Sequence, residues 1–318
     1  MSGSSCCAPS GGNVAESTSA GPAFERVRSG ATESMVLIEI QRFQMGTDYP
    51  EGFKADGEGP IRETQVDPFY IDVHTVSNRD FQAFVKATHY QTEAEAFGWS
   101  FVFWLLIPPY KRKRYVGKGE TVLGLEWWYR VDGADWCHPF GPDSNIKKLP
   151  DHPVVHMSHR DARAYAEWAG KRLPTEAEWE CAARGGLNQN LYVWGDDLTP
   201  NGKHMCNIWQ GDFPAANTAE DGYIGTAPVF SFPANGYGIH NMAGNVWEWC
   251  CDWWSASDHV KGPRENPQGP SSGSRRVMRG GSYLCHDSYC NRYRVAARTA
   301  NTPDSSTGNL GFRCVRDV

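Results

Sequence analysis

The chain has 318 residues, enough for one large domain or two of ordinary size. Its 33 glycines, 20 prolines and 13 tryptophans favour a loop-rich fold packed by aromatic rings and argue against a helical bundle. A formal net charge of −6 disfavours a nucleic-acid-binding protein, since such proteins are usually basic.

The first 33 residues are rich in Ser, Gly and Ala and have little to bury, which predicts a disordered tail over 1–33. They lack the basic and apolar regions of a signal peptide, and no apolar stretch of the chain reaches the roughly 20 residues of a membrane span. The ten cysteines are scattered and do not form the framework typical of secreted domains. We therefore expect a cytoplasmic protein.

After the tail, the alternating segment 35–46 predicts an edge-forming hairpin. A strand from Pro68 then leads into the first of three helices, and each helix is expected to begin at a capping residue with an acidic residue three positions on. These pairs are Ser77 and Asp80, Ser158 and Asp161, and Thr175 and Glu178. Gly185 and Gly186 are expected to end the third helix.

Residues 96–150 lie between the first two helices and show no hydrophobic periodicity. The segment is longer than an ordinary loop, so we expect an irregular surface excursion. Its basic run, Lys111–Arg114, is expected to be a solvated loop.

Two groups of oxygen-bearing residues lie among turns. They are Asn207, Ile208, Asp221 and Tyr223, and then Asn241, Gly244, Val246 and Glu248. Side-chain oxygens mixed with loop carbonyls are the ligands that Ca²⁺ takes. The same residue types are common in ordinary turns, and from the sequence alone that interpretation is the stronger one.

The most informative stretch is Arg279–Cys314. Cys285 and Cys290 form a C-x4-C pair with polar residues between them, preceded by Gly280 and Gly281 and followed by turns, which indicates a shaped loop. This spacing is no standard zinc or redox motif. It leaves open a local disulfide, two inert buried thiols, or two thiolates for a soft metal such as Cu(I).

The stretch resembles the formylglycine-generating enzymes, also called sulfatase-modifying factors, in the blocks GGSYLCHDSYCNRYR, AAR, NTPDSS and NLGFRC. Similar blocks extend back to about Met35. The resemblance implies a single catalytic domain over 34–318. Its fold would be α+β with little regular secondary structure, the formylglycine-generating-enzyme variant of the C-type-lectin fold.

The resemblance also implies the activity: a copper-dependent oxidase that converts the cysteine of a C-x-P-x-R motif in an unfolded sulfatase to Cα-formylglycine. O2 and an external thiol reductant would take part. Cys285 and Cys290 would hold Cu(I), and the substrate thiolate would join the metal. Matching positions that line the oxygen pocket or surround the substrate cysteine are Ser282, Trp247, Tyr289, Ser306 and Asn309.

Two further residues keep alternative interpretations. His286, beside a copper ligand, is either a supporting hydrogen-bond donor or a structural histidine. Asp304 either binds substrate or shapes a turn. We expect a monomer that binds neither nucleic acid nor membrane.

The family carries two structural calcium sites, and the resemblance maps them onto the two oxygen-rich groups above. Ile208, Tyr223, Gly244 and Val246 would act through their backbone carbonyls. Vertebrate secretory members also have disulfides that align with Ala166 and Cys314, and with Ala183 and Val295. Three of these four positions are not cysteine here, which fits a reducing compartment.

Three other classes compete with the enzyme. Non-catalytic paralogues lack the cysteine pair that this chain has, and a related sulfoxide-forming iron enzyme needs a helical iron-binding domain that we do not find. The hypothesis of a sugar-binding lectin rests on the fold alone, and a fold does not assign a function. In the tail, Cys7–Gly11 resembles C-x-P-S-R with Gly in place of Arg, either as a weak pseudosubstrate or by chance in a flexible segment.

Overall fold

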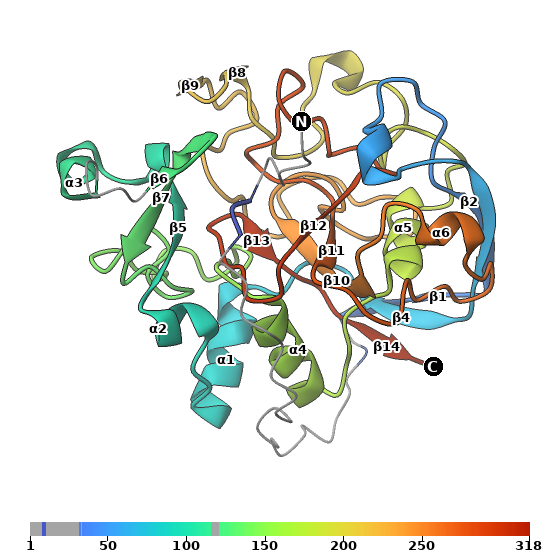
Figure 1. Cartoon of the computed structure of the whole chain (residues 1–318), viewed down its shortest axis with the longest axis horizontal. Helices are drawn as coiled ribbons and strands as arrows, with labels where there is room; N and C mark the ends of the chain where they lie inside the picture. The colour runs from blue at the N-terminus through green and yellow to red at the C-terminus, as the bar shows by residue number, and fades with distance from the viewer. Residues whose placement is uncertain (1–7, 11–31, 33, 116–120) are drawn as a thin grey trace.

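The computed structural model describes residues 8–10, 32, 34–115 and 121–318. Within this part of the chain, short strands form five small sheets, and the helices between them are joined by long loops (Figure 1). The prediction of an α+β fold with little regular secondary structure is confirmed. No helix in the described ranges is long and apolar enough to cross a membrane.

The central sheet has the strand order β12-β11-β10-β13. Its strands are β10 (Trp247–Trp253), β11 (Arg276–Arg279), β12 (Arg298–Asn301) and β13 (Leu310–Gly311). Strands β10, β11 and β12 pair in antiparallel fashion, and β13 lies parallel to β10. The sheet lies in the middle of the molecule, so the connection from β11 to β12 that carries the cysteine pair starts and ends in the core (Figure 1).

The predicted hairpin over 35–46 is wrong. The segment does form two strands, β1 (Met35–Ile38) and β2 (Gln41–Met45), but they do not pair with each other. Strand β1 pairs with β4 (Phe69–Asp72), which also pairs with β14 (Val315–Asp317), and β2 pairs with β3 (Arg62–Val66). Alternation identifies a strand with one buried face but does not specify its partner.

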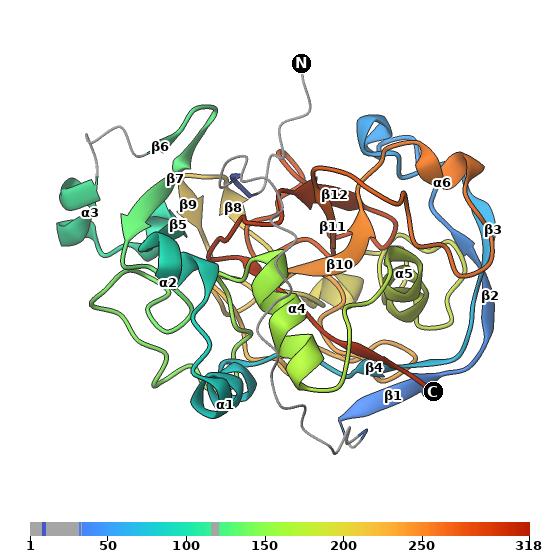
Figure 2. The same ribbon diagram turned by 60° about the horizontal axis from the view of Figure 1, so that its bottom comes forward.

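The three predicted helices are confirmed. They are α1 (Asn78–Thr88), α4 (His159–Trp168) and α5 (Glu176–Arg184), and all three predicted capping boxes are present. The aromatic ring of Tyr165 on α4 packs against Phe81 and Phe84 of α1, with ring centroids 5.9 and 5.6 Å apart. Helix α5 is buried along its whole length, between the central sheet and β2–β3 (Figure 2).

The excursion over 96–150 is more regular than predicted. It contains α2 (Glu93–Phe97) at its start, then β5 (Trp99–Phe103), α3 (Pro109–Tyr115), β6 (Thr121–Val122) and β7 (Leu125–Asp132). The strands form a sheet in the order β5-β7-β6, whose periodicity is hidden because large aromatic residues occupy both faces. Phe103 and Trp128 of this sheet pack in one cluster with Tyr283 from the cysteine loop.

The basic run of the excursion lies in α3 and not in a loop, which corrects the sequence-based interpretation. Lys111 forms an ion pair of 2.7 Å with Asp143, and the Arg112 guanidinium lies over the ring of Trp104. The remaining short elements are β8 (Gly211–Asp212), β9 (Ala216–Asn217), α6 (Asp258–Lys261) and the 3-10 turns Lys54–Asp56, Trp104–Leu106 and Pro200–Gly202.

The tail predicted to be disordered lies largely outside the described residues. Within it, Ala8–Ser10 are described, and Ala8 and Pro9 are buried. This short dark-blue segment lies against the end of β12, where all three residues contact Asn301 (Figure 1).

Candidate functional site

The cysteine pair lies in the loop 280–297 between β11 and β12. Cys285 and Cys290 are fully buried, and their sulfur atoms are 3.3 Å apart. This separation exceeds the roughly 2.05 Å of a disulfide bond, so the two sulfurs are not bonded to each other. Cys285 is a free thiol, whereas Cys290 is disulfide-bonded, though not to Cys285. The structure brings the predicted pair into contact.

Two consecutive turns shape the loop. The amide N–H of Cys285 donates to the carbonyl of Ser282 (2.9 Å), and that of Cys290 donates to the carbonyl of His286 (2.6 Å). Gly281, just before the first turn, has a φ of +74°, and a Cβ there would lie 3.0 Å from the carbonyl oxygen of Arg292. Glycine is therefore required where the chain enters the loop.

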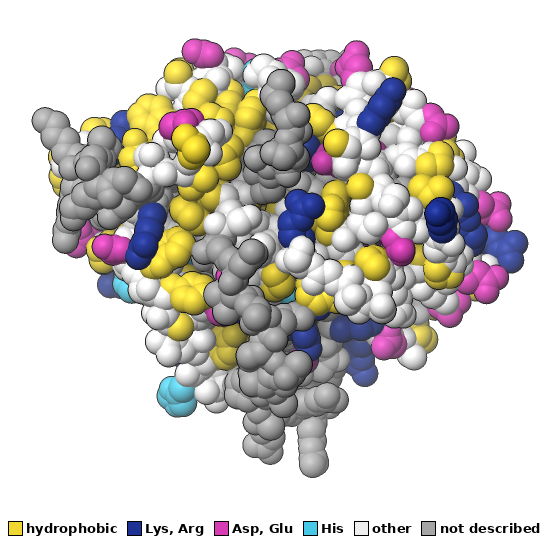
Figure 3. All heavy atoms as spheres, in the orientation of Figure 1, with side chains coloured by type: hydrophobic (Ala, Val, Ile, Leu, Met, Phe, Trp, Pro, Cys, Tyr) yellow, Lys and Arg dark blue, Asp and Glu magenta, His cyan; other side chains and the backbone are white. Residues whose placement is uncertain are grey.

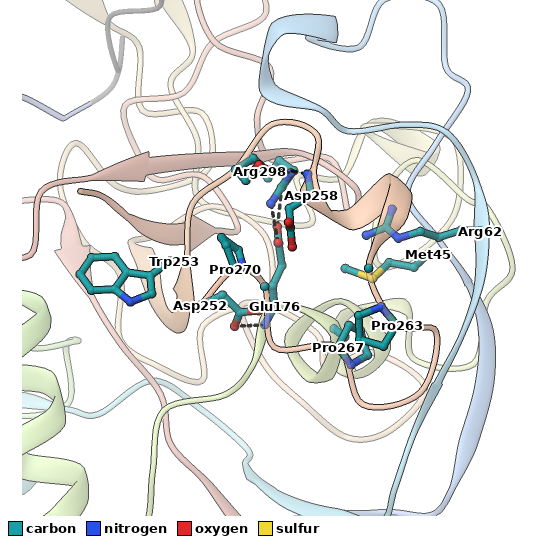
Figure 4. A pocket seen from close by; sticks show the side chains of 14 residues that line it. Met45, Arg62, Glu176, Asp252, Trp253, Asp258, Pro263, Pro267, Pro270 and Arg298 are labelled. Carbon is teal, nitrogen blue, oxygen red and sulfur yellow. Dashed lines mark hydrogen bonds and ion pairs between the residues drawn. The ribbon is translucent and has the colours of Figure 1, made fainter. Parts of the chain in front are cut away.

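Helix α5 ties the two ends of this loop together. Arg279, the last residue of β11, and Arg298, the first of β12, are register partners, and both donate to Oε1 of Glu176, at 2.9 and 2.6 Å. Figure 4 shows the Glu176–Arg298 pair in the wall of a pocket. Although burial raises the pKa of Glu176, the two arginines outweigh it and hold that pKa below its usual value. The carboxylate stays charged and clamps the base of the loop.

Ser282 and Asn309 are joined to the cysteine pair by hydrogen bonds. The N–H of Ser282 donates to Sγ of Cys285 (3.4 Å), and Nδ2 of Asn309 donates to Oγ of Ser282 (2.9 Å). Asn309 is itself held, because its Oδ1 accepts from Thr307 and its carbonyl accepts from the N–H of Trp247. Of the residues matched to the family's site, Ser282 therefore contacts Cys285 directly, and Asn309 and Trp247 are linked to it through Ser282.

Ser306 lies at the end of a buried hydrogen-bonded chain. Its Oγ is 2.9 Å from Oγ of Ser100, which is 2.8 Å from Nδ1 of His156. Nε2 of His156 is 2.9 Å from the carbonyl of Pro139 and must donate, since a carbonyl only accepts. Burial lowers the pKa of His156 to about 4, so the ring is neutral near pH 7, and its Nδ1 accepts the hydroxyl proton of Ser100.

Aromatic rings border the pair on one side. The ring of Tyr289 stacks on Phe213 with centroids 4.8 Å apart and meets Trp127 edge-on at 5.0 Å. All three rings are partly buried, and Figure 3 shows hydrophobic side chains gathered at the upper left of this face, over the β5–β7 and β8–β9 sheets. Extended polypeptide with apolar side chains fits such a surface.

His286 is partly exposed and borders a neighbouring pocket together with Asp287 and Tyr293. Its Nδ1 is 2.8 Å from Oγ of Ser288 and 3.1 Å from the carboxylate of Asp287. These local contacts match the structural interpretation of this histidine, because they order the turn between the two cysteines.

Asp304 is buried at 3% exposure, and its Oδ1 has no hydrogen-bond partner in the described part of the chain. A buried carboxylate oxygen without a partner is costly, so this oxygen stays able to accept a hydrogen bond from a bound molecule.

Arg292 also lies beside the cysteine pair, although the sequence does not indicate it. Its guanidinium is 3.7 Å from Sγ of Cys290, lies over the ring of Phe53 and forms a 2.6 Å ion pair with Asp56. Such a cation would favour the thiolate of Cys290 once its disulfide is reduced. In the sequence, this arginine cannot be told from a surface residue, because Asp56 and Phe53 come from a segment far away in the chain.

The first oxygen-rich group comes together around Asp221. Its carboxylate accepts from the amide of Ile208 (3.1 Å) and from that of Tyr223 (2.9 Å). Asn207 is fully buried, and its Oδ1 has no hydrogen-bond partner among the described residues. An amide oxygen in that state fits a cation ligand.

The second group shares this feature only in part. Oδ1 of Asn241 is buried and lacks a partner in the described ranges. Both carboxylate oxygens of Glu248, in contrast, accept from Arg313 at 2.7 Å, and one also accepts from Trp179. The Arg313 ion pair competes with a role for the Glu248 side chain as a metal ligand. A backbone bridge between Asn207 and Gly244 joins the two groups.

Comparison with known proteins identifies the family of this chain. The profile of the sulfatase-modifying factor enzyme 1-like domain matches residues 21–318. The chain is 57% identical over 293 residues to a formylglycine-generating enzyme of Thermomonospora curvata, covering 90% of this chain and 94% of that protein. It is 55% identical over 298 residues to the formylglycine-generating enzyme of Streptomyces coelicolor, covering 94% and 93%.

Among solved structures, PvdO from Pseudomonas aeruginosa shares the fold, with a TM-score of 0.64 at 23% identity over 89% of this chain and 94% of that one. The sequence matches go further than the fold. This chain belongs to the sulfatase-modifying factor family.

Proposed function

We propose that this protein generates formylglycine by oxidising the cysteine of a C-x-P-x-R motif in an unfolded sulfatase. The observation that carries the proposal is the buried contact between Cys285 and Cys290, in a chain 57% identical to a protein named formylglycine-generating enzyme. Conversion of the cysteine side chain to an aldehyde releases sulfide and removes two electrons. Reduction of O2 to two water molecules takes those two electrons and two more from an external thiol.

Copper(I) is the cofactor we propose. Once the disulfide of Cys290 is reduced, two buried sulfur atoms 3.3 Å apart form a soft donor set, and soft ligands select Cu(I). Copper held by Cys285 and Cys290 would supply one-electron chemistry toward O2. The Arg292 guanidinium, 3.7 Å from Cys290, would favour the thiolate form that a metal requires.

The remaining residues would position the substrate and fix the sulfur atoms. The N–H of Ser282 orients Sγ of Cys285, and Asn309 holds Ser282 in place. The Tyr289 ring and its aromatic neighbours would contact the unfolded polypeptide and exclude water. The Ser100–His156 chain fixes the hydroxyl of Ser306, which stays available for proton transfer at Oγ.

We also propose structural Ca²⁺ at the two oxygen-rich groups. The buried amide oxygens of Asn207 and Asn241, both without hydrogen-bond partners in the described ranges, support the two sites.

Both sites also have competing partners. In the first, Nε2 of Gln210 donates to the carbonyl of Ile208 and to the carboxylate of Asp221. In the second, Arg313 binds the carboxylate of Glu248.

A monomer in the reducing cytoplasm is the setting we propose. The described cysteines outside the site are free thiols, which matches such a compartment. These residues are Cys137, Cys181, Cys206, Cys250, Cys251 and Cys314.

The test is turnover of a short Cys-x-Pro-Ser-Arg peptide under oxygen and a thiol reductant, with and without added Cu(I), measured by mass spectrometry. We expect an aldehyde product that depends on copper and is lost in Cys290→Ser. The matched control is Cys137→Ser, which removes a cysteine outside the site and should retain turnover. Absence of product from folded, copper-loaded protein would overturn the proposed function.

A further inference from the structure

We propose that the N-terminal segment Cys7–Gly11 is an intramolecular pseudosubstrate, which binds through Ala8–Ser10 where the C-x-P-S-R peptide binds and competes with it. This inference rests on the proposed function for the identity of the competing peptide. Cys7 and Gly11 lie outside the described residues, so every contact below belongs to Ala8, Pro9 or Ser10.

The segment carries most of the substrate motif. Cys7, Pro9 and Ser10 have the same spacing as the cysteine, proline and serine of C-x-P-S-R. Gly11 stands where the motif has arginine. A segment of this composition keeps the groups that shape the peptide backbone but lacks the terminal cation, so it would bind more weakly than a complete motif.

One buried side chain contacts the three described residues of the segment. Nδ2 of Asn301 donates to the carbonyls of Ala8 (3.2 Å) and Pro9 (3.1 Å), and Oδ1 of Asn301 accepts from Oγ of Ser10 (2.6 Å). Ala8 is 1% exposed and Asn301 is fully buried. A segment without a specific binding site would not bury an alanine, and it would not contact both the oxygen and the nitrogen of the buried Asn301 side chain.

Asn301 also begins the segment 301–309, which hydrogen bonds connect to the cysteine pair. It is the last residue of β12, and its Oδ1 accepts from Oγ of Ser305 (3.1 Å) within the turn that follows. The same segment continues to Asn309, which reaches Cys285 through Ser282. The tail is therefore held by the stretch that carries the proposed substrate contacts.

The contacts explain how a complete motif would displace the tail. Asn301 binds two backbone carbonyls and a serine hydroxyl through hydrogen bonds, and a C-x-P-S-R peptide has the same three groups. Because the tail belongs to the same chain as the site, its effective concentration there is on the order of millimolar, and a free peptide competes with this high local concentration. The arginine of a true substrate adds binding that the tail does not have. Competition of this kind raises KM and leaves kcat unchanged.

The first experiment measures the binding of a fluorescent Ser-Ala-Pro-Ser-Arg peptide, which cannot react, by anisotropy. Deletion of residues 2–11 should lower its Kd about tenfold or more, because the tethered competitor is removed. Ser10→Ala removes one hydrogen bond to Asn301 and should lower Kd about threefold. Ser17→Ala, also in the tail but outside the motif, is the matched control and should leave Kd unchanged.

The second experiment uses hydrogen exchange of the segment 299–309. Deletion of residues 2–11 should speed exchange there, and a Cys-Ala-Pro-Ser-Gly peptide added in trans should slow it again. Equal exchange rates with and without the tail, or equal Kd values for the fluorescent peptide, would overturn the proposal.

The two proposals fail separately. A Kd that depends on the tail, together with no aldehyde product, overturns the proposed function and leaves the competition intact. Turnover with a Kd that is independent of the tail overturns the pseudosubstrate alone. Loss of the Cys7 sulfur from the wild-type protein during turnover would identify a self-substrate and would also overturn the inhibitory role.

Discussion

Two buried polar regions lie next to each other in this protein and differ in how their groups are satisfied. In the first, on α5, Glu176 and Glu180 are each held by arginines at 2.6 to 2.9 Å. Burial raises the pKa of Glu180, but Arg184 and Arg279 outweigh it and lower that pKa to about 2. In the second, the cysteine loop, two sulfur atoms lie side by side with one guanidinium 3.7 Å away.

The difference shows that burial of polar groups does not by itself mark an active site. The α5 cluster pairs each of its glutamates with arginine and supports the loop, since Arg279 and Arg298 are the residues where the loop begins and ends. The cysteine loop instead holds two neighbouring sulfur atoms, to which we assign the proposed activity. One region should therefore control stability and the other activity.

The largest expected effect is on activity. Cys285→Ala should reduce turnover of the Cys-x-Pro-Ser-Arg peptide on the order of a thousandfold or more. Cys285 and Cys290 are proposed to act together, so loss of one should disable the pair. The free energy of unfolding should change little, since the substitution removes one sulfur atom from a loop whose ends stay clamped. A variant with near wild-type turnover would remove the cysteine pair from the mechanism.

The next effect is on stability. Glu176→Ala leaves Arg279 and Arg298 buried without their shared carboxylate and should lower the free energy of unfolding by about 3–5 kcal/mol. Urea unfolding measures this loss. Glu63→Ala, at an exposed position of β3, is the control and should change stability by about 0.5 kcal/mol or less. Similar values for the two variants would contradict the assignment of the clamp.

Calcium removal tests a contribution that lies outside both regions. If Ca²⁺ is present at about 100 times its Kd, chelation by EGTA should cost about 3 kcal/mol for each site and lower Tm. Asn207→Ala should already have a lower Tm and respond less to EGTA, whereas Asn188→Ala, at an exposed position, should respond like the wild type. An unchanged Tm after exhaustive chelation would exclude structural calcium.

The smallest expected effect concerns His156. Its pKa is lowered from 6.5 to about 4 in the folded protein, so the unfolded chain binds more protons and stability falls as pH drops through this range. Between pH 7 and pH 5, the loss should be about 2 kcal/mol. His156→Asn should be less stable than the wild type at pH 7, but its free energy of unfolding should fall less between pH 7 and pH 5. Equal pH dependence in urea unfolding of the two proteins would show that His156 does not titrate as described.

Local structure and the cysteine pair can be read from the sequence alone. Capping boxes such as Thr175 with Glu178 satisfy backbone donors within four residues, so they specify where a helix begins without help from distant parts of the chain. Cys285 and Cys290 are likewise close in sequence, and Gly281 supplies the backbone conformation at the entrance to their loop. Short-range features of this kind are readable from a single sequence.

Strand pairing and the distant residues around the cysteines follow from the tertiary fold. The alternation in 35–46 predicts two strands, but their partners lie at 69–72 and 62–66. A strand pairs with the strand edge that core packing places next to it, and this edge can come from a distant segment. Arg292 meets Cys290 while held by Asp56, and Asn301 meets Ala8 across almost the full length of the chain. Contacts between segments this far apart depend on the packing of the whole core, and no local pattern in the sequence encodes them.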